Sequence, residues 1–299
     1  MKDWKAELLL LFNTLIWGAT FMFTKIGLED APPSLYIIMR FIIALALSLL
    51  LFGRHLFKAN KETVWQGLLL GTFFAGGFLL QTYGLKFTSV TKSAFITGLT
   101  VPVTPFIFKL FFRKKIKKWS IIGVVVATIG LWIFTNPGLT DMNIGDIFTI
   151  LSTIFWALYI IFMDSFTKNK DKFSESAQLV MLQFIAAAPV SAIFFFIFEY
   201  QALELNFTTN LLVSLAFNGI MASFLVTFIH TAVQKYTTPV KAALIFSFEP
   251  VLASVIAMIF LSEFLNLREY AGALILFSGI LVSELGPYIF NRRYSKTPK

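Results

Sequence analysis

Long apolar runs separated by short polar stretches follow one another along the whole chain of 299 residues. A helix needs about 20 consecutive apolar residues to cross the hydrocarbon core of a bilayer. Nearly every run reaches that length, and the fifth is at the lower limit. The pattern predicts an all-α membrane protein with ten transmembrane helices, over residues 6–27, 34–53, 64–84, 92–112, 119–135, 147–166, 176–198, 210–233, 241–262 and 268–290.

One stretch of the chain occurs twice, at a constant offset of 149 residues. Ten spans divide into five plus five, and two copies with an odd number of spans must lie upside down relative to each other. We therefore expect two inverted five-helix repeats, residues 1–138 and 139–290, followed by a basic tail at 291–299. The matching positions are Lys86, Thr88, Lys92, Gly123 and Gly130 in the first copy and Lys235, Thr237, Lys241, Gly272 and Gly279 in the second.

Earlier fragments of the two halves also match, at smaller offsets that are consistent with loop insertions. Ile16-Trp17-Gly18 corresponds to Phe155-Trp156-Ala157, and Met39-Arg40 corresponds to Leu182-Gln183. Inverted repeats are the architecture of secondary transporters, which hold their substrate at the repeat interface near the bilayer midplane. The repeat thus predicts a transporter before any other chemistry is considered.

The basic residues predict the orientation of the chain. With both termini cytoplasmic, 19 of the 25 Lys and Arg residues fall on the cytoplasmic side, including the cluster at 113–118. This is the asymmetry of the positive-inside rule. The net charge of +9 then reflects short loops that face anionic lipid headgroups, and a nucleic-acid partner is not expected.

Composition excludes several other classes of protein. Only 14% of the residues are charged and 57% are hydrophobic, which is not the composition of a soluble domain. The chain has no cysteine and two histidines, so disulfides, thiolate metal sites and cysteine nucleophiles are absent. We expect neither a metal nor a cofactor, and no catalytic residues.

Several short motifs are shared with a known family of transporters: Ile16–Phe21, Arg40, Tyr236–Ala243, Glu249-Pro250-Val251 and Phe260–Phe264. Through these motifs the chain resembles the drug/metabolite transporter superfamily, specifically its ten-helix proteins with two EamA domains. The resemblance covers essentially the whole chain and implies export or exchange of small metabolites, often amino acids or related compounds. The two halves differ at Glu263, which has no counterpart in the first half, where the basic cluster stands.

Glu249 and Pro250 are the first candidates for a substrate site. An ionisable residue this deep in a span is costly and is by default a functional hypothesis. The alternatives are that Glu249 pairs structurally with Lys241 or Arg40, or that it is simply protonated. Proline-interrupted helices at matching places in both halves point to a transporter site. Thr100 aligns with Glu249. Pro102, Pro105 and Pro250 are the expected helix breaks, with plain kinks as the alternative.

Aromatic residues form a second candidate feature. Trp17 and Trp156 lie in the middle of spans at repeat-equivalent positions, and Tyr159 shares a helical face with Trp156. Together they can form a wall that stacks on a substrate or contacts its cation. Ordinary helix packing is the alternative in a chain that is 17% aromatic.

Four further polar residues are candidates for binding, coupling or gating. Asn218 can hydrogen-bond either the substrate or a neighbouring helix. Arg40 can bind a carboxylate, although pairing with an acidic neighbour is the favoured interpretation. Gln81 and His230 occupy matching positions near span ends, where His230 fits a gate or a solvated residue.

The preferred function is a secondary carrier that moves a small metabolite, such as an amino acid or amine, by alternating access across the cell membrane. A sugar or nucleotide-sugar permease of the same superfamily is the alternative. An intramembrane enzyme acting on lipid-linked substrates is a distant one, because no acid–base or metal-binding cluster is present in the sequence.

Overall fold

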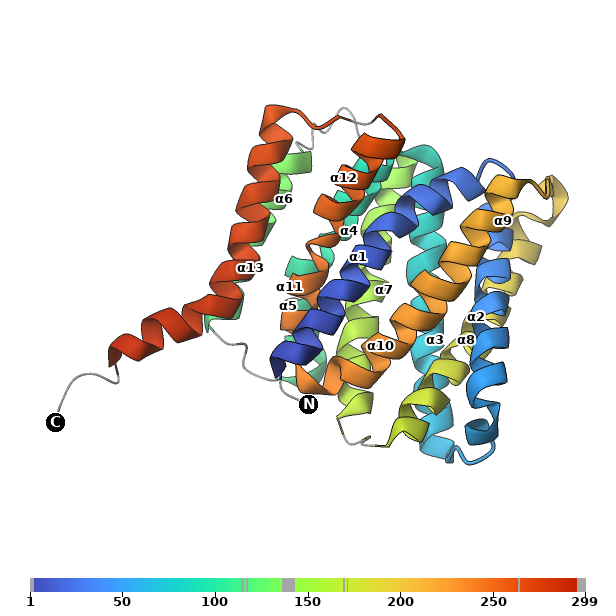
Figure 1. Cartoon of the computed structure of the whole chain (residues 1–299), viewed down its shortest axis with the longest axis horizontal. Coiled ribbons are helices and arrows are strands. Elements are labelled where there is room, and N and C mark those ends of the chain that lie inside the picture. The colour runs from blue at the N-terminus through green and yellow to red at the C-terminus, as the bar shows by residue number, and fades with distance from the viewer. Residues whose placement is uncertain are drawn as a thin grey trace.

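The computed structural model describes residues 3–113, 116, 118–135, 143–168, 170, 172–262 and 264–294. All regular structure in these residues is helical, and the helices pack side by side as a bundle (Figure 1). The first half contains α1 (Asp3–Gly27), α2 (Pro33–Leu56), α3 (Lys61–Phe87), α4 (Val90–Thr97), α5 (Thr100–Phe112) and α6 (Lys118–Thr135). The second half contains α7 (Ile144–Thr167), α8 (Phe173–Phe198), η1 (Tyr200–Ala202), α9 (Thr209–Ala216), the π-helical η2 (Phe217–Leu225), α10 (Val226–Val233), η3 (Gln234–Tyr236), α11 (Pro239–Phe246), α12 (Glu249–Phe260) and α13 (Leu267–Tyr294).

Eight segments of the described chain are long and apolar enough to cross a membrane. They coincide with predicted spans one to four and six to nine. The fifth prediction corresponds to a shorter apolar helix, Lys118–Phe134. The tenth falls in α13, where several side chains after residue 280 lie outside the described residues. The chain is thus a multi-pass all-α membrane protein, and the count of ten spans stays a prediction.

Two spans, the fourth and the ninth, are each broken into two helices. Helix α4 ends at Thr97 and α5 begins at Thr100, while α11 ends at Phe246 and α12 begins at Glu249. Each break comes one turn before a proline rather than at the proline itself. The reason is steric, since a proline ring clashes with the carbonyl four residues earlier, which is Gly98 for Pro102 and Phe246 for Pro250.

The prolines themselves therefore lie inside the second half-helices. Pro250 is in the first turn of α12, where its missing N–H costs nothing. Pro102 is the third residue of α5, and Pro105 lies inside α5 without ending it. The expectation that these residues mark helix breaks holds for the two spans as a whole but misplaces each break by about one turn.

The pair formed by α6 and α13 reveals the symmetry of the two halves. The two helices lie against each other at one edge of the bundle (Figure 1). A Cβ atom added to Gly123 would lie 2.6 Å from the carbonyl oxygen of Gly279, and one added to Gly272 would lie 2.8 Å from that of Gly130. Only glycine permits this approach of two backbones.

These contacts are reciprocal, because Gly123 and Gly130 are the repeat counterparts of Gly272 and Gly279. Gly123 contacts Gly279, and their repeat counterparts Gly272 and Gly130 contact each other in the same way. A two-fold axis produces this pattern. The contacts that the repeat glycines make thus fit two halves related by a two-fold axis in the membrane plane, as inversion requires.

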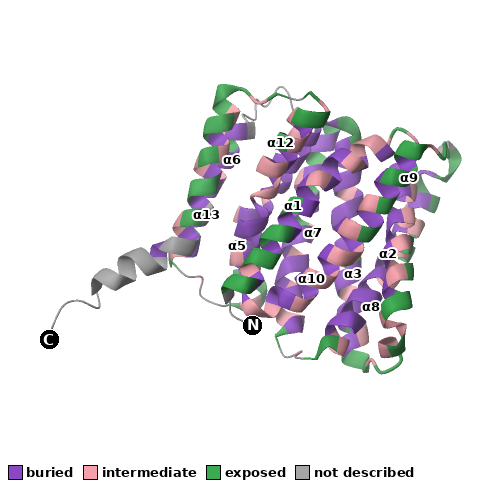
Figure 2. Cartoon of the chain, in the orientation of Figure 1, coloured by how far each residue is buried: buried purple, intermediate pink, exposed green. Residues whose placement is uncertain are grey.

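Close helix contacts also position the interior aromatic residues. A Cβ atom on Gly18 of α1 would lie 2.8 Å from Cβ of Leu252 in α12, and one on Gly77 of α3 would lie 2.9 Å from the Trp156 ring. Both glycines let large neighbours approach the centre of the bundle. Buried residues accordingly concentrate in the middle of the helices, while exposed ones lie on the outer faces (Figure 2).

Three features of the sequence analysis lie outside the described residues. The proposed boundary between residues 138 and 139 falls within 136–142, and Glu263 is likewise not described. Of the basic tail, residues 295–299 are not described.

Candidate functional site

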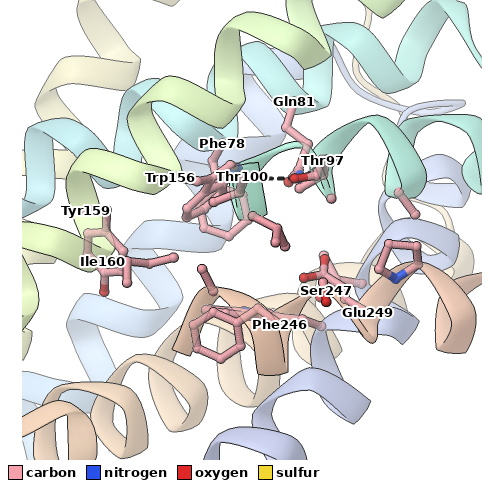
Figure 3. Close-up of a pocket in the computed structure, with 17 residues that line it drawn as sticks. Phe78, Gln81, Thr97, Thr100, Trp156, Tyr159, Ile160, Phe246, Ser247 and Glu249 are labelled. Atoms are coloured by element: carbon pink, nitrogen blue, oxygen red, sulfur yellow. Dashed lines mark hydrogen bonds between the residues drawn. The ribbon is translucent and has the colours of Figure 1, made fainter. Parts of the chain in front are cut away.

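The two helix breaks border one cavity in the centre of the bundle. The ends of α4 and α11 and the starts of α5 and α12 line it, together with α1, α3 and α7. Figure 3 shows Thr97 and Thr100 on one side of this space and Phe246, Ser247 and Glu249 on the other. Its lining consists of Trp17, Thr20, Phe78, Gln81, Ala94, Thr97, Gly98, Thr100, Val101, Trp156, Tyr159, Ile160, Ala243, Phe246, Ser247, Glu249 and Pro250.

Glu249 is the acidic residue of this lining and begins α12. Among the described residues, its carboxylate has no hydrogen-bond or ion-pair partner. The two cations considered as structural partners contact other groups: Lys241 pairs with Glu7 at 2.8 Å, and Arg40 donates to Ser223. The start of a helix favours a negative charge, and a charged carboxylate within the membrane is costly unless a cation pairs with it. The cavity therefore offers an acceptor for a cation.

The aromatic residues of the lining form a continuous series. Trp17 lies with its ring centroid 5.0 Å from that of Phe246 and 6.3 Å from that of Trp156. Trp156 in turn packs edge-on against Phe78, at 4.8 Å, and against Tyr159, at 6.2 Å. The predicted aromatic wall is thus one connected cluster at the cavity, contributed by both repeats.

The two repeat-equivalent tryptophans differ in their indole N–H groups. Trp17 donates to the carbonyl oxygen of Ala222 at 3.1 Å, in the π-helical stretch η2. The indole nitrogen of Trp156 has no partner among the described residues, and the same holds for the hydroxyl of Thr20. Trp17 is thus fixed by the protein, while Trp156 and Thr20 leave polar groups unsatisfied at the cavity.

A polar edge faces Glu249 across the cavity. Gln81 donates to the Thr97 hydroxyl at 3.0 Å, a bond drawn in Figure 3. Thr97 and Thr100 in turn bond carbonyls of α4, those of Ser93 and Thr97. Gln81 therefore stabilises the end of α4 next to the break.

Comparison with known protein families shows which family this chain belongs to. The model of the EamA-like transporter family matches residues 4–136 and 143–285, which is nearly the whole chain in two segments. The chain belongs to the EamA-like transporter family.

Individual relatives agree with the family. This EamA-like chain is 30% identical to an uncharacterized transporter of Archaeoglobus fulgidus, over 95% of the chain and 87% of that protein. It is 26% identical to the transporter YoaV of Bacillus subtilis, over 94% and 96%. A probable amino-acid metabolite efflux pump of Salmonella typhimurium is 23% identical over 94% and 95%.

One solved crystal structure shares the fold of the EamA-like chain. It superimposes with a TM-score of 0.74 and covers 99% of this chain and all of the other, at 13% identity. At that identity the likeness concerns the fold alone.

Of the residues predicted to bind substrate or to couple or gate transport in the EamA-like chain, three do not line the cavity, and neither do Pro102 and Pro105. Asn218 donates to the hydroxyls of Tyr36, at 2.6 Å, and Thr24, at 3.0 Å. It therefore joins η2 to α1 and α2, as helix-bonding amides do. Asn218 was predicted to be a site residue because it is a polar residue deep within a span, but depth alone does not show which way a side chain faces.

Arg40 and His230 lie behind the lining. The Arg40 guanidinium lies 4.0 Å from the centroid of the Phe78 ring and donates to Ser223, but none of the described acidic residues pairs with it. The expected acidic partner is therefore not found. His230 is fully buried, packs edge-on against Trp17 and Phe246, and bonds Gln234. It is not the solvated histidine that its position near a span end suggested.

Sequence reasoning missed several lining residues of the EamA-like chain, among them Phe78, Thr97, Phe246 and Ser247. Thr97 and Phe246 are repeat counterparts at the two breaks. The signal was present in the proline positions, because each break falls two to four residues before Pro102 or Pro250.

Proposed function

We propose that this EamA-like transporter is a secondary carrier of amino acids and related small amines that works by alternating access, as an exporter or exchanger. One observation supports this most directly: the unpaired carboxylate of Glu249 and an aromatic cluster share a cavity between two broken spans. Broken spans at matching places in inverted repeats are where such carriers bind substrate.

The chemistry of the lining favours a cationic group next to an apolar one. Glu249 binds the ammonium group of the substrate, and the faces of Trp17, Trp156 and Tyr159 contact its cation or its side chain. Thr100 begins α5 on the other side of the cavity. An amino-acid substrate places its carboxylate toward this polar side of the cavity, where Gln81, Thr97 and Thr100 lie. The name of the Salmonella typhimurium relative supports the same substrate class.

The lining argues against a nucleotide sugar. A diphosphate needs several cations, and the described residues that line the cavity include no lysine or arginine. Arg40 lies behind Phe78. An intramembrane enzyme is likewise disfavoured, because the part of the lining that the structure describes offers one carboxylate and no hydrogen-bonded nucleophile–base pair.

Transport by purified protein tests the proposal. Proteoliposomes loaded with labelled amino acids, amines and nucleotide sugars should release amino acids or amines with apolar or aromatic side chains, and retain the nucleotide sugars. Empty liposomes and liposomes with denatured protein measure leakage. Release of nucleotide sugars alone would contradict the proposed substrate class.

We further propose that the chain resides in the cell membrane with both termini cytoplasmic, as the distribution of basic residues favours. A reporter fused within residues 31–33 should then be active only outside the cell, and one fused within 113–118 only in the cytoplasm. The opposite pattern would reverse the orientation.

A further inference from the structure

Two ion pairs join the two halves of the chain. The Lys92 Nζ lies 2.7 Å from an Asp146 carboxylate oxygen, and the Lys241 Nζ lies 2.8 Å from a Glu7 carboxylate oxygen. Each lysine stands in the first turn of a half-helix, α4 or α11. Each carboxylate stands near the start of the first long helix of the other half, α7 or α1.

The two pairs are counterparts under the internal repeat. Lys92 and Lys241 are separated by the repeat offset of 149 residues, and Glu7 and Asp146 by 139, the offset that relates Trp17 to Trp156. A surface ion pair formed by chance has no reason to recur at both offsets. The same inter-repeat contact is therefore built twice.

The two pairs lie on opposite sides of the cavity. Helix α4 begins at the end of the bundle where α3 finishes, and α11 begins at the end where α1 starts (Figure 1). Each lysine precedes a cavity residue, Thr97 or Phe246, by five positions. At 1.5 Å per residue this is roughly 8 Å along the helix, so each pair lies between the cavity and one end of the bundle.

We propose that Lys92–Asp146 and Lys241–Glu7 are the two alternating gates of the transporter. The proposal rests on the carrier function proposed above. When the two halves rock, the side that opens must separate the residues that join them there, while the other pair stays closed. Both pairs are formed in this structure, so neither proposed gate is open in it.

The two gates differ in strength. Asp146 is fully buried and accepts hydrogen bonds from Thr88 and the Asn143 backbone besides its ion pair. Glu7 and Lys241 each keep about a fifth of the side chain exposed. Solvent-exposed pairs contribute little, while separating a buried carboxylate from its partner is costly. The Glu7–Lys241 gate therefore opens more readily, so the cavity opens preferentially to the face that bears the N-terminus.

Thiol labelling tests the gates without any substrate. The chain has no cysteine, so Ser247→Cys places a single thiol in the cavity. A charged, membrane-impermeant methanethiosulfonate reagent is added from either face, and an accessible N-terminal tag identifies the faces. Lys241→Gln should raise labelling from the N-terminal face about tenfold, the ratio that corresponds to 1.4 kcal/mol. Lys92→Gln should raise labelling from the opposite face.

Lys92→Gln is preferred to an Asp146 substitution because it leaves the other bonds of that carboxylate in place. Lys168→Gln is the matched control, since it removes an ion pair of 2.6 Å with Asp164 inside one half of the chain. It should change labelling from neither face. The exchange of charges, Glu7→Lys with Lys241→Glu, should restore the low labelling of the parent.

The proposal of two gates would be wrong if labelling stayed unchanged in both lysine variants, or if it rose equally from both faces. The outcome is independent of the substrate. If the labelling shifts as expected but no amino acid or amine is transported, the gates stand and the proposed substrate fails. If an amino acid or amine is transported but labelling does not change in the lysine variants, the proposed substrate stands and the proposed gates fail.

Discussion

Glu249→Gln should reduce transport of the amine or amino-acid substrate about 100-fold at subsaturating concentration. The change keeps the size of the side chain and the start of α12 but removes the charge. A substrate ammonium group would then enter a membrane-embedded cavity without a counter-ion. Removing one partner of a desolvated charge pair costs about 3–5 kcal/mol, and each 1.4 kcal/mol is a factor of ten, so 100-fold is a conservative expectation.

Efflux from proteoliposomes measures this effect, and two further variants define it. Glu249→Asp keeps the charge and should retain part of the activity. Glu199→Gln changes a buried glutamate that is not part of the cavity lining and accepts a hydrogen bond from the Ser34 backbone at 2.9 Å. It should lower thermal stability and leave the apparent substrate affinity unchanged. Equal efflux by the parent and Glu249→Gln would make Glu249 a structural residue.

The repeat explains which parts of the site could be predicted from the sequence. Trp17, Trp156, Thr100 and Glu249 stand at counterpart positions, and the structure brings all four to one cavity. Counterparts in inverted repeats lie at similar depth around a common axis, so symmetry in the sequence becomes proximity in space. Tyr159 follows because it shares a helical face with Trp156.

Other parts could not be predicted, because they depend on how the helices are rotated and tilted. Asn218 has the same polarity and depth as a site residue, but the rotation of η2 turns it toward Tyr36. The partners Lys92 and Asp146 are 54 positions apart, and their pairing depends on how α4 and α7 cross. Such contacts follow from tertiary packing and leave no periodicity in the sequence.

Trp156→Ala is expected to weaken substrate binding by about 30- to 100-fold. Trp156 joins Phe78 to Tyr159 in the aromatic cluster and packs on Gly77. Its loss removes the contact face of the substrate and leaves a void that the neighbouring rings do not fill. A cation–π contact contributes about 0.5–2 kcal/mol, and losing a large apolar face adds to this, which together gives about 2.0–2.8 kcal/mol or 30- to 100-fold.

Trp156→Phe tests whether the aromatic ring or the indole N–H group of Trp156 binds the substrate. It keeps a ring edge-on to Phe78 and should stay within about threefold of the parent, since it lacks only the unpartnered N–H and part of the area. Trp65→Ala is the control, because that ring is 57% exposed on the outside of the bundle. The dissociation constant of the labelled substrate should be measured for all three variants. If Trp156→Phe loses as much affinity as Trp156→Ala, the N–H group rather than the aromatic face would be what binds the substrate, and an equal loss in Trp65→Ala would trace the effect to helix packing.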